Sequence, residues 1–314
     1  MKRLLILQIV TLFFFSCDRG SEEKPTLQIQ DNSSNYVGRQ VCKECHLKQY
    51  ELFTGSDHDL AMDEATAETV LGDFNNHVFE HHGVTSRFYK RNNEFYVNTE
   101  GGDGALKEFK IKYVFGIRPL QQYVVEFPNG RFQMLPICWD TRLLKDGGQR
   151  WFHIYDRERI PHNDQLNWTR MAHNWNYMCS ECHSTNVQKQ YDYKREMYST
   201  TWSEIDVSCE ACHGPGSEHV DWAEAAEKGL KSNVRGYLGL AMRLKDADNA
   251  TWILRDTEKG TAERTSPRAN RQLVDMCGRC HARRSIISEN YVHGKSLLDT
   301  HHPSFLQENL YFSD

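Results

Sequence analysis

Apolar and polar positions alternate in short runs between residues 84 and 138, with turn sequences between the runs. Alternation with a period of two is typical of half-buried β-strands. The turn sequences RNNE, EGGDG and PNGR are of the Asn-rich and Gly-rich kinds that close hairpins. The pattern therefore predicts an antiparallel meander of strands near residues 84–90, 94–99, 106–115, 121–127 and 131–138.

Outside this region the apolar spacing is helical, and the predicted helices are short. The apolar residues of 47–53 predict a helix that breaks near Gly55, and His58 would open the next one. The stretch SEHVDWAEAAEKGL predicts another helix, with Ser217 as its N-cap. The remaining chain from residue 163 is also expected to form short helices. The predicted fold class is α+β: mostly short helices with little regular core, plus the antiparallel meander.

Composition and charge narrow the class of protein. The chain has 314 residues, of which 39% are hydrophobic, and its mean hydropathy is −0.70. This is polar for a chain that must bury a core, so either much of it is surface or something other than side chains fills part of the interior. The net charge is −5 and no run of Lys and Arg stands out, so nucleic acid is not an expected partner.

The first residues, MKRLLILQIVTLFFFSC, have the pattern of an export signal. Lys2 and Arg3 precede an apolar run that is too short to span a bilayer as a helix. The run is closed by Cys17 and resembles a bacterial lipoprotein signal, in which such a cysteine carries the lipid anchor. We therefore expect a lipoprotein-type signal peptide over 1–17 and a flexible polar tether over 18–35.

Eight of the ten cysteines form four pairs with two residues between the partners, and a histidine directly follows each pair. Cys-x-x-Cys-His is the covalent attachment signature of c-type haem. On one helical turn the two thiols and the imidazole share a face, so the thiols can reach the haem vinyl groups while the imidazole faces the iron. The predicted haem-binding residues are Cys42, Cys45, His46, Cys179, Cys182, His183, Cys209, Cys212, His213, Cys277, Cys280 and His281.

Two other kinds of site use paired cysteines. A zinc site would need two of the pairs brought together, and it gives no reason for a histidine after every second cysteine. A thioredoxin-like redox motif would need only one pair beside a βαβ unit. Four covalent haems account for all four motifs, and they also account for the polar composition because four apolar rings would fill part of the interior.

The second axial ligands are expected to be histidines as well. Four of the fifteen histidines are proximal ligands, which leaves eleven, whereas no Met lies in a repeated context. His219 follows the Gly-Pro-Gly bend after the third motif, and His58 lies twelve residues after His46, so both are predicted distal ligands. His301, His81 and His153 are weaker candidates. Cys138 is predicted to be a buried free thiol.

With the motifs placed, the chain resembles the tetrahaem c-type cytochromes that accept electrons in hydroxylamine oxidation. It is more similar still to larger bacterial proteins in which a multihaem domain with repeated CXXCH motifs is fused to tetratricopeptide repeats. The stretches that carry the resemblance include YVGRQVCKECHLKQYELFTGSDHDLAM, PLQQYVVEFPNGRFQMLPICWD, NWNYMCSECHSTN and TWSEIDVSCEACHGPGSEHV. The resemblance implies electron transfer in the periplasm or at the cell envelope, and it places His58 and His219 in ligand-bearing segments. The larger relatives continue beyond this C-terminus into further haem motifs and the repeats, which is consistent with a chain that is part of a longer protein.

The expected function is that of an exported, membrane-anchored tetrahaem cytochrome c that relays electrons to redox partner proteins of the cell envelope. A first haem segment (36–83), a β insertion (84–140) and a helical region that packs around three haems (141–314) would follow the tether. One alternative is an oxidoreductase in which an open-coordination haem acts on a small nitrogen or sulfur compound. Another is a docking module that uses the β insertion as its contact surface.

Overall fold

The structure is a computed structural model, and it describes residues 34–234, 236–244, 250–256, 258, 260–268 and 270–305. It combines a large antiparallel sheet with short helices, as the α+β prediction requires. The signal peptide, Cys17 and residues 18–33 of the tether lie outside the described residues. In the described part of the chain, no helix has the length and apolar character needed to cross a membrane.

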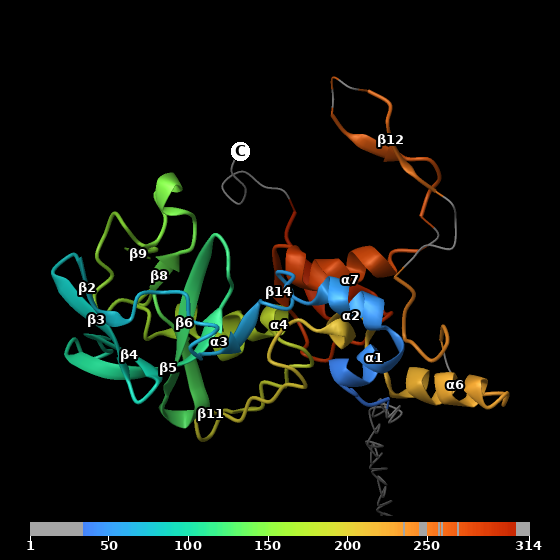
Figure 1. Cartoon of the computed structure of the whole chain (residues 1–314), viewed down its shortest axis with the longest axis horizontal. Helices are drawn as coiled ribbons and strands as arrows, with labels where there is room; N and C mark the ends of the chain where they lie inside the picture. Colours follow the sequence, from blue (N-terminus) through green and yellow to red (C-terminus); the bar gives the residue numbers. More distant parts are fainter. Residues whose placement is uncertain are drawn as a thin grey trace, which may run out of the picture. The chain divides into compact units, whose positions relative to one another are not determined.

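One antiparallel sheet of nine strands dominates the β region (Figure 1). Its main path runs β2-β3-β4-β5-β6-β8-β9, while β1 pairs with β5 and β7 pairs with β6. Neighbours in the sheet are mostly neighbours in sequence, because tight turns join them. The strands are β1 (Met62–Glu64), β2 (Asn75–His81), β3 (Val84–Arg91), β4 (Glu94–Glu100), β5 (Leu106–Phe115), β6 (Leu120–Phe127), β7 (Arg131–Met134), β8 (Ile137–Asp140) and β9 (Arg150–His153).

The predicted turn sequences close hairpins, and their residues have the backbone angles that such turns need. Asn92 and Asn93, between β3 and β4, have φ of 52° and 61°. Asn129 and Gly130, between β6 and β7, have φ of 65° and 67°. Positive φ at both central residues matches the twist of the flanking strands, and Asn and Gly tolerate it best. The prediction of hairpins at RNNE and PNGR is confirmed.

The predicted bounds of one strand and of the sheet are corrected. The strand expected over 131–138 is two strands, β7 and β8, because Pro136 has no N–H to give to the ladder and interrupts the pairing. The sheet also takes in β1, β2 and β9, which lie outside the range 84–140 that was expected to contain it. The division of the chain into an inserted sheet and haem segments stays a prediction.

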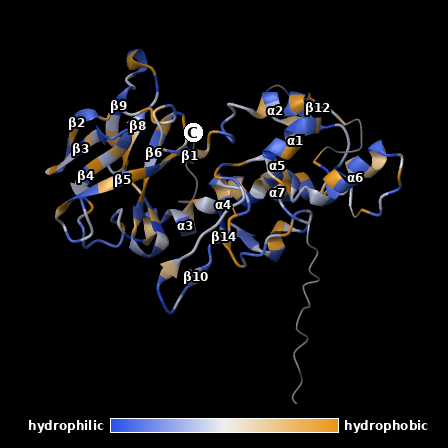
Figure 2. Ribbon diagram, turned by 60° about the horizontal axis from the view of Figure 1, so that its bottom comes forward, coloured by the Kyte–Doolittle hydropathy of each residue, from blue (hydrophilic) through white to orange (hydrophobic). Residues whose placement is uncertain are grey.

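Aromatic residues fill the core on one face of the sheet. Phe74 is 1% exposed, and its ring meets the rings of Phe88, Phe95, Tyr123 and Trp151 edge to face. Such pairs add about 0.5–1.5 kcal/mol each beyond the area they bury. The alternation of apolar and polar positions that predicted the strands is visible along them in Figure 2.

The opposite face of the sheet packs against the segments that lead into the second and third cysteine motifs. Val124 faces the other way from Tyr123 because side chains alternate along a strand. It belongs to a second buried cluster with Met62, Tyr113, Met134 and Trp175, against which Cys179, Trp202 and Ile205 also pack. The sheet therefore supports the region of the chain where the haem motifs lie.

The helices are short and surround the cysteine motifs: α1 (Arg39–Cys45), α2 (Leu47–Phe53), α3 (Trp175–Met178), α4 (Ser180–His183), α5 (Cys209–His213), α6 (Ser217–Glu227) and α7 (Gln272–His281). The predicted break after 47–53 is confirmed, since Thr54 caps α2 and Gly55 has φ of 80°. The helix after the Gly-Pro-Gly bend is also confirmed. Its N-cap, however, is Gly216 and not Ser217, because the Ser217 hydroxyl accepts the N–H of Asn35 instead (2.8 Å).

Three small hairpins complete the fold: β10 (Tyr191–Asp192) with β11 (Met197–Tyr198), β12 (Trp252–Leu254) with β13 (Ala262–Arg264), and β14 (Arg284–Ile286) with β15 (His301–Pro303). Four short 3₁₀ turns also occur among the described residues, η1 (Pro128–Gly130), η2 (Leu144–Asp146), η3 (Met171–His173) and η4 (Leu297–Asp299). The β14–β15 hairpin follows α7 in the chain. It lies next to the second cysteine motif, where His301 on β15 contacts Glu181.

Candidate haem sites

All four Cys-x-x-Cys-His motifs lie on helical turns, as their spacing predicts. The first is in α1 with His46 as the cap, and the second spans the junction of α3 and α4. The third makes up α5, and the fourth ends α7. The eight motif cysteines are free thiols, so each is chemically able to form a thioether.

The structure brings the motifs together in two pairs. The thiol of Cys42 in the first motif lies beside that of Cys209 in the third, which raises the pKa of Cys42 and lowers that of Cys209, and α1 contacts α5. The thiol of Cys182 in the second motif lies beside that of Cys280 in the fourth and 4.0 Å from the Cys280 carbonyl oxygen, and α4 contacts α7. The pairing is therefore first with third and second with fourth.

Glu210, inside the third motif, holds the segment that enters the first motif. Its side chain is buried (2% exposed), and it accepts hydrogen bonds from the backbone N–H groups of Val37 (2.9 Å), Gly38 (2.8 Å) and Gly216 (2.8 Å). Hydrogen bonds to a carboxylate are stronger than those between neutral groups. One side chain thus fixes both the start of α1 and the bend after the third motif.

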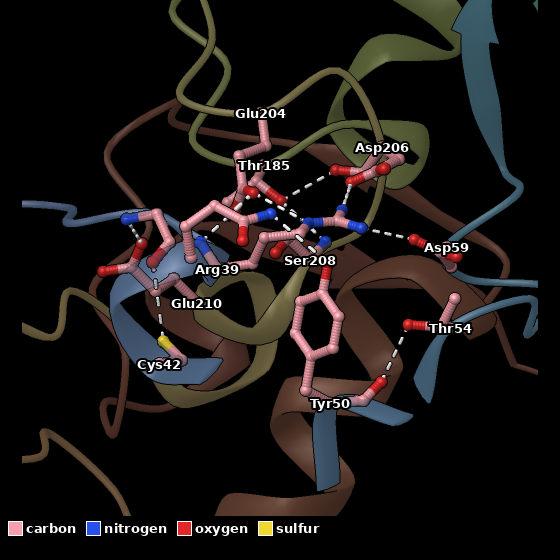
Figure 3. A network of polar contacts seen from close by, with 12 residues as sticks. Arg39, Cys42, Tyr50, Thr54, Asp59, Thr185, Glu204, Asp206, Ser208 and Glu210 are labelled. Carbon is pink, nitrogen blue, oxygen red and sulfur yellow. Dashed lines mark hydrogen bonds and ion pairs between the residues drawn. The ribbon is translucent and has the colours of Figure 1, made fainter. Parts of the chain in front are cut away.

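Arg39 provides a second connection between motifs, shown in Figure 3. Its guanidinium binds the carboxylates of Asp59, Glu204 and Asp206. Asp206 is linked onward, because its carbonyl accepts the hydroxyl of Thr185, and the Thr185 oxygen accepts the N–H of Ser208. The network joins α1 to the turn around His58 and to the segment between the second and third motifs.

This network contains three carboxylates, those of Asp59, Glu204 and Asp206, around one guanidinium, that of Arg39. The pKa of Asp206 is raised to about 7, chiefly by burial; Arg39 opposes this shift, and repulsion from Glu204, Asp59 and Asp63 adds to it. Burial opposes the positive charge of Arg39, but Asp206, Glu204 and Asp59 stabilise it and raise the pKa of the guanidinium. Asp206 is therefore the group in this cluster that titrates near neutral pH.

His219 lies opposite His46. The two rings are nearly parallel, with an interplanar angle of 17° and centroids 6.0 Å apart. The Nδ1 of His219 is hydrogen-bonded to the carbonyl of Leu238 (2.7 Å). A bond of this kind fixes the ring and leaves Nε2 for a metal, as is usual for metal-bound histidine.

His58 lies opposite His281 in the same way. Their ring centroids are also 6.0 Å apart, with an interplanar angle of 70°. His58 does not open a helix, as the sequence suggested; it lies in a turn between α2 and β1. The turn closes on itself, since Asp59 accepts the N–H of Gly55 (2.7 Å), and this competes with helix formation.

The spacing of both histidine pairs fits an iron between the rings. Imidazole nitrogens bind metals at about 2 Å, so two rings on opposite sides of one ion have centroids roughly 6 Å apart. The two neighbouring cysteines of each motif can hold a porphyrin beside such an iron. The residues present are therefore suited to c-type haem.

The two remaining motif histidines lie beside these pairs, with the side chain of His183 half-buried and that of His213 exposed. The Nδ1 of His183 is 3.4 Å from the carbonyl of Ala61, and the Phe115 ring lies 3.9 Å from the His183 ring. Partial burial lowers the pKa of His183, which favours the neutral form that binds metals.

The weaker distal candidates lie elsewhere. Both ring nitrogens of His301 are occupied, one by the Thr300 hydroxyl (2.8 Å) and one by the Glu181 carboxylate (2.9 Å). His81 and His153 stack on each other 4.0 Å apart, on strands β2 and β9. Burial and the neighbouring His81 lower the pKa of His153 to about 4. Among the described residues, these three histidines have no ring contact with a motif histidine, and their assignment as ligands stays a prediction.

Cys138 is a buried free thiol on β8, as predicted, with 0% exposure. Burial raises its pKa to about 12. It is unreactive for that reason, because the thiolate is the nucleophilic form.

Sequence reasoning missed three residues that organise the motifs: Arg39, Glu210 and His293. His293 is buried against the third motif, with its Nε2 3.1 Å from the carbonyl of Ala211. It lies twelve residues after His281, the same offset that separates His58 from His46, and this repeat could have identified it. Arg39 and Glu210 carried no such signal, since their partners are distant in sequence.

Residues 41–82 and 151–214 match the family described as cytochrome c554 and c-prime. These ranges contain the first three motifs and His58, but not the other predicted distal histidine, His219. The match supports a multihaem c-type cytochrome. Covalently bound haem c and electron transfer through haem are supported with it.

Comparison with curated proteins gives no match in sequence. Among solved structures, the undecaheme cytochrome from the S-layer of Carboxydothermus ferrireducens is similar with a TM-score of 0.38 and 15% identity. That match covers 83% of this chain and 29% of the undecaheme cytochrome, so this chain corresponds to less than a third of its length.

Proposed function

We propose that this chain is an exported tetrahaem cytochrome c that relays single electrons through four covalent haems at the cell envelope. The observation that carries the proposal is the grouping of four Cys-x-x-Cys-His motifs into two pairs. Covalent attachment at paired motifs would hold neighbouring haems close together, as electron relay requires. The protein would set each potential through the axial ligand, burial and hydrogen bonding.

The proposed proximal ligands are His46, His183, His213 and His281. His219 would bind the same iron as His46, and His58 the same iron as His281. Ligation by two histidines favours lower potentials than ligation by histidine and methionine. The carbonyls of Leu238 and Ala61 would orient His219 and His183, respectively, through their Nδ1 atoms.

Export and anchoring form part of the proposal. The signal sequence would direct the chain out of the cytoplasm, and Cys17 would carry a lipid that holds it at the membrane. The electron donor and acceptor would then be redox proteins of the cell envelope. The family match to c-type cytochromes supports an extracytoplasmic location.

The ligand assignment can be tested with the purified, haem-loaded protein. His219→Ala and His58→Ala should each convert one low-spin haem to a high-spin haem in the electron paramagnetic resonance spectrum. His302→Ala removes an exposed histidine and should leave the spectrum unchanged. Fully low-spin spectra for both ligand variants would contradict the assignment.

One observation favours an enzymatic alternative for a single haem. The ring centroids of His183 and Phe115 are 3.9 Å apart, and no imidazole of the described residues is in ring contact with His183, so the haem of the second motif is the one to examine for an open coordination position. In that case the wild-type protein would show a high-spin signal that cyanide abolishes, and the Cys179→Ala/Cys182→Ala variant would lack it. A wild-type protein with four low-spin haems that do not bind cyanide would leave electron relay as the function.

A further inference from the structure

We propose that Arg279 and Tyr291 form a carboxylate-binding site at the junction of the second, third and fourth motifs, and that a haem propionate occupies it. The inference rests on the proposed function, because the propionate belongs to one of the proposed haems. Arg279 and Tyr291 are not axial ligands, and through the propionate they would influence the potential of that haem.

The site is a cavity of about 60 Å³ whose lining includes Tyr36, Glu181, Lys189, Arg279, Tyr291 and His293. A cavity of this size holds a carboxylate or a few water molecules. It is far smaller than the pockets that bind drug-sized ligands, which are roughly 300–1,000 Å³. The expected occupant is therefore a small group and not a large free molecule.

The charges that line the cavity leave one cation without a carboxylate. Lys189 is 7% exposed and pairs with Glu289 (3.1 Å). Glu181 is bound by Arg284 (2.9 Å) and by His301. Among the described residues, Arg279 has no carboxylate within ion-pair distance; its guanidinium instead lies 4.9 Å from the centre of the Tyr291 ring.

Tyr291 supplies a buried hydroxyl that lacks a partner, since no group of the described chain is hydrogen-bonded to it. Buried hydroxyls nearly always have a partner, so an orphaned one marks a place where a partner binds. Arg279 and Tyr291 both donate hydrogen bonds, and an anion that accepts from both would satisfy the two groups together.

The position of the cavity identifies the source of the anion. Arg279 stands between Cys277 and Cys280, the two attachment cysteines of the fourth motif. Its charge also acts on Cys212 of the third motif, and Glu181 of the cavity wall belongs to the second motif. Each haem attached at these cysteines carries two propionate groups, which need donors once they are inside the protein.

The test compares midpoint potentials of the haem-loaded wild type with those of Arg279→Gln and Tyr291→Phe. Removing a buried positive charge beside a haem favours the ferric state, so Arg279→Gln should lower the potential of one haem. A tenfold fall in the ferrous-to-ferric ratio corresponds to about 59 mV for a one-electron couple. Tyr291→Phe keeps the ring and should shift the same haem in the same direction, by less.

Lys295→Gln removes an exposed positive charge near Tyr291 in sequence and is the matched control, which should leave all potentials unchanged. Arg279→Lys keeps the charge, so the potential of this haem should stay close to the wild-type value. Unchanged potentials in Arg279→Gln and Tyr291→Phe, with full haem content by mass, would overturn the site. Wild-type potentials that respond to added formate, with no response in Arg279→Gln, would show that a free anion occupies the cavity, which also contradicts the propionate. A protein without haem adducts would instead overturn the proposed function.

Discussion

Two buried carboxylates four residues apart, Asp206 and Glu210, are stabilised in different ways. Glu210 accepts hydrogen bonds from three backbone N–H groups, and it shares none of these donors with another carboxylate of the described residues. Asp206 binds Arg39, but it shares that guanidinium with Asp59 and Glu204. Glu210 is therefore expected to act as a fixed connection, and Asp206 as a group whose charge depends on pH.

Glu210→Ala should destabilise the contact between the first and third motifs. The change leaves buried N–H groups of Val37 and Gly216 without an acceptor, which costs about 1–3 kcal/mol for each unsatisfied group. Urea denaturation followed by haem absorbance would measure the loss. Glu227→Ala, at an exposed position on α6, should change the midpoint little, and an equal effect of both substitutions would contradict the role of Glu210.

Asp206→Asn should change how stability depends on pH. The pKa of Asp206 is about 7 in the folded protein against an ordinary value of 3.8, so the folded state binds this proton more tightly. The contribution of this proton to the stability of the folded state is fully present below pH 3.8 and is lost as the pH rises to about 7. The stability of Asp206→Asn relative to the wild type should therefore increase over this range in denaturation experiments at several pH values. A difference that is constant or falls with pH would show that the pKa is not raised.

At the scale of elements, residues that tolerate a positive φ determine where the chain reverses between neighbouring strands. Asn93 has φ of 61° in the β3–β4 turn, a conformation that costs an ordinary side chain roughly 1–2 kcal/mol. Asn93→Ala should destabilise the protein by about 1 kcal/mol, whereas Asn93→Gly should be neutral or slightly stabilising. Thermal denaturation of the two variants would show this order, and equal effects would contradict it.

The elements show which parts of the fold a sequence can specify. The β3–β4 and β6–β7 hairpins and the break after α2 depend on residues that are local in sequence, such as Asn93 and Gly55, and they were predictable. The break at Pro136 was a local signal that the length of the apolar run obscured. The addition of β1 and β9 to the sheet could not be predicted, because their pairing depends on tertiary packing with distant strands.

The same limit applies to the haem sites. The motif residues were predictable because their spacing encodes the chemistry. His219 and His58 were proposed from their position after a bend or a helix, and the structure places each opposite a motif histidine. Glu210 and Arg279 were not predicted, since their importance depends on partners or a cavity contributed by segments far away in the chain.

At the scale of the whole molecule, the pairing of motifs predicts unequal coupling between haems. Removing the third haem with Cys209→Ala/Cys212→Ala should shift the potential of the first haem more than those of the second and fourth. The reason is that a charge on one haem acts most strongly on its nearest neighbour, and the interaction weakens with distance. Redox titration followed by electron paramagnetic resonance would resolve the shifts, and equal shifts at all three remaining haems would contradict the pairing.

The central claim is that four iron porphyrins are held covalently by four motifs in one chain. Intact mass spectrometry of the protein, purified from a host that matures c-type cytochromes, tests it most directly. The account predicts a denatured mass equal to the processed polypeptide plus four haems, with Cys-to-Ala change of any one motif removing one haem. A mass of polypeptide alone, or of polypeptide with zinc that is released on denaturation, would contradict it.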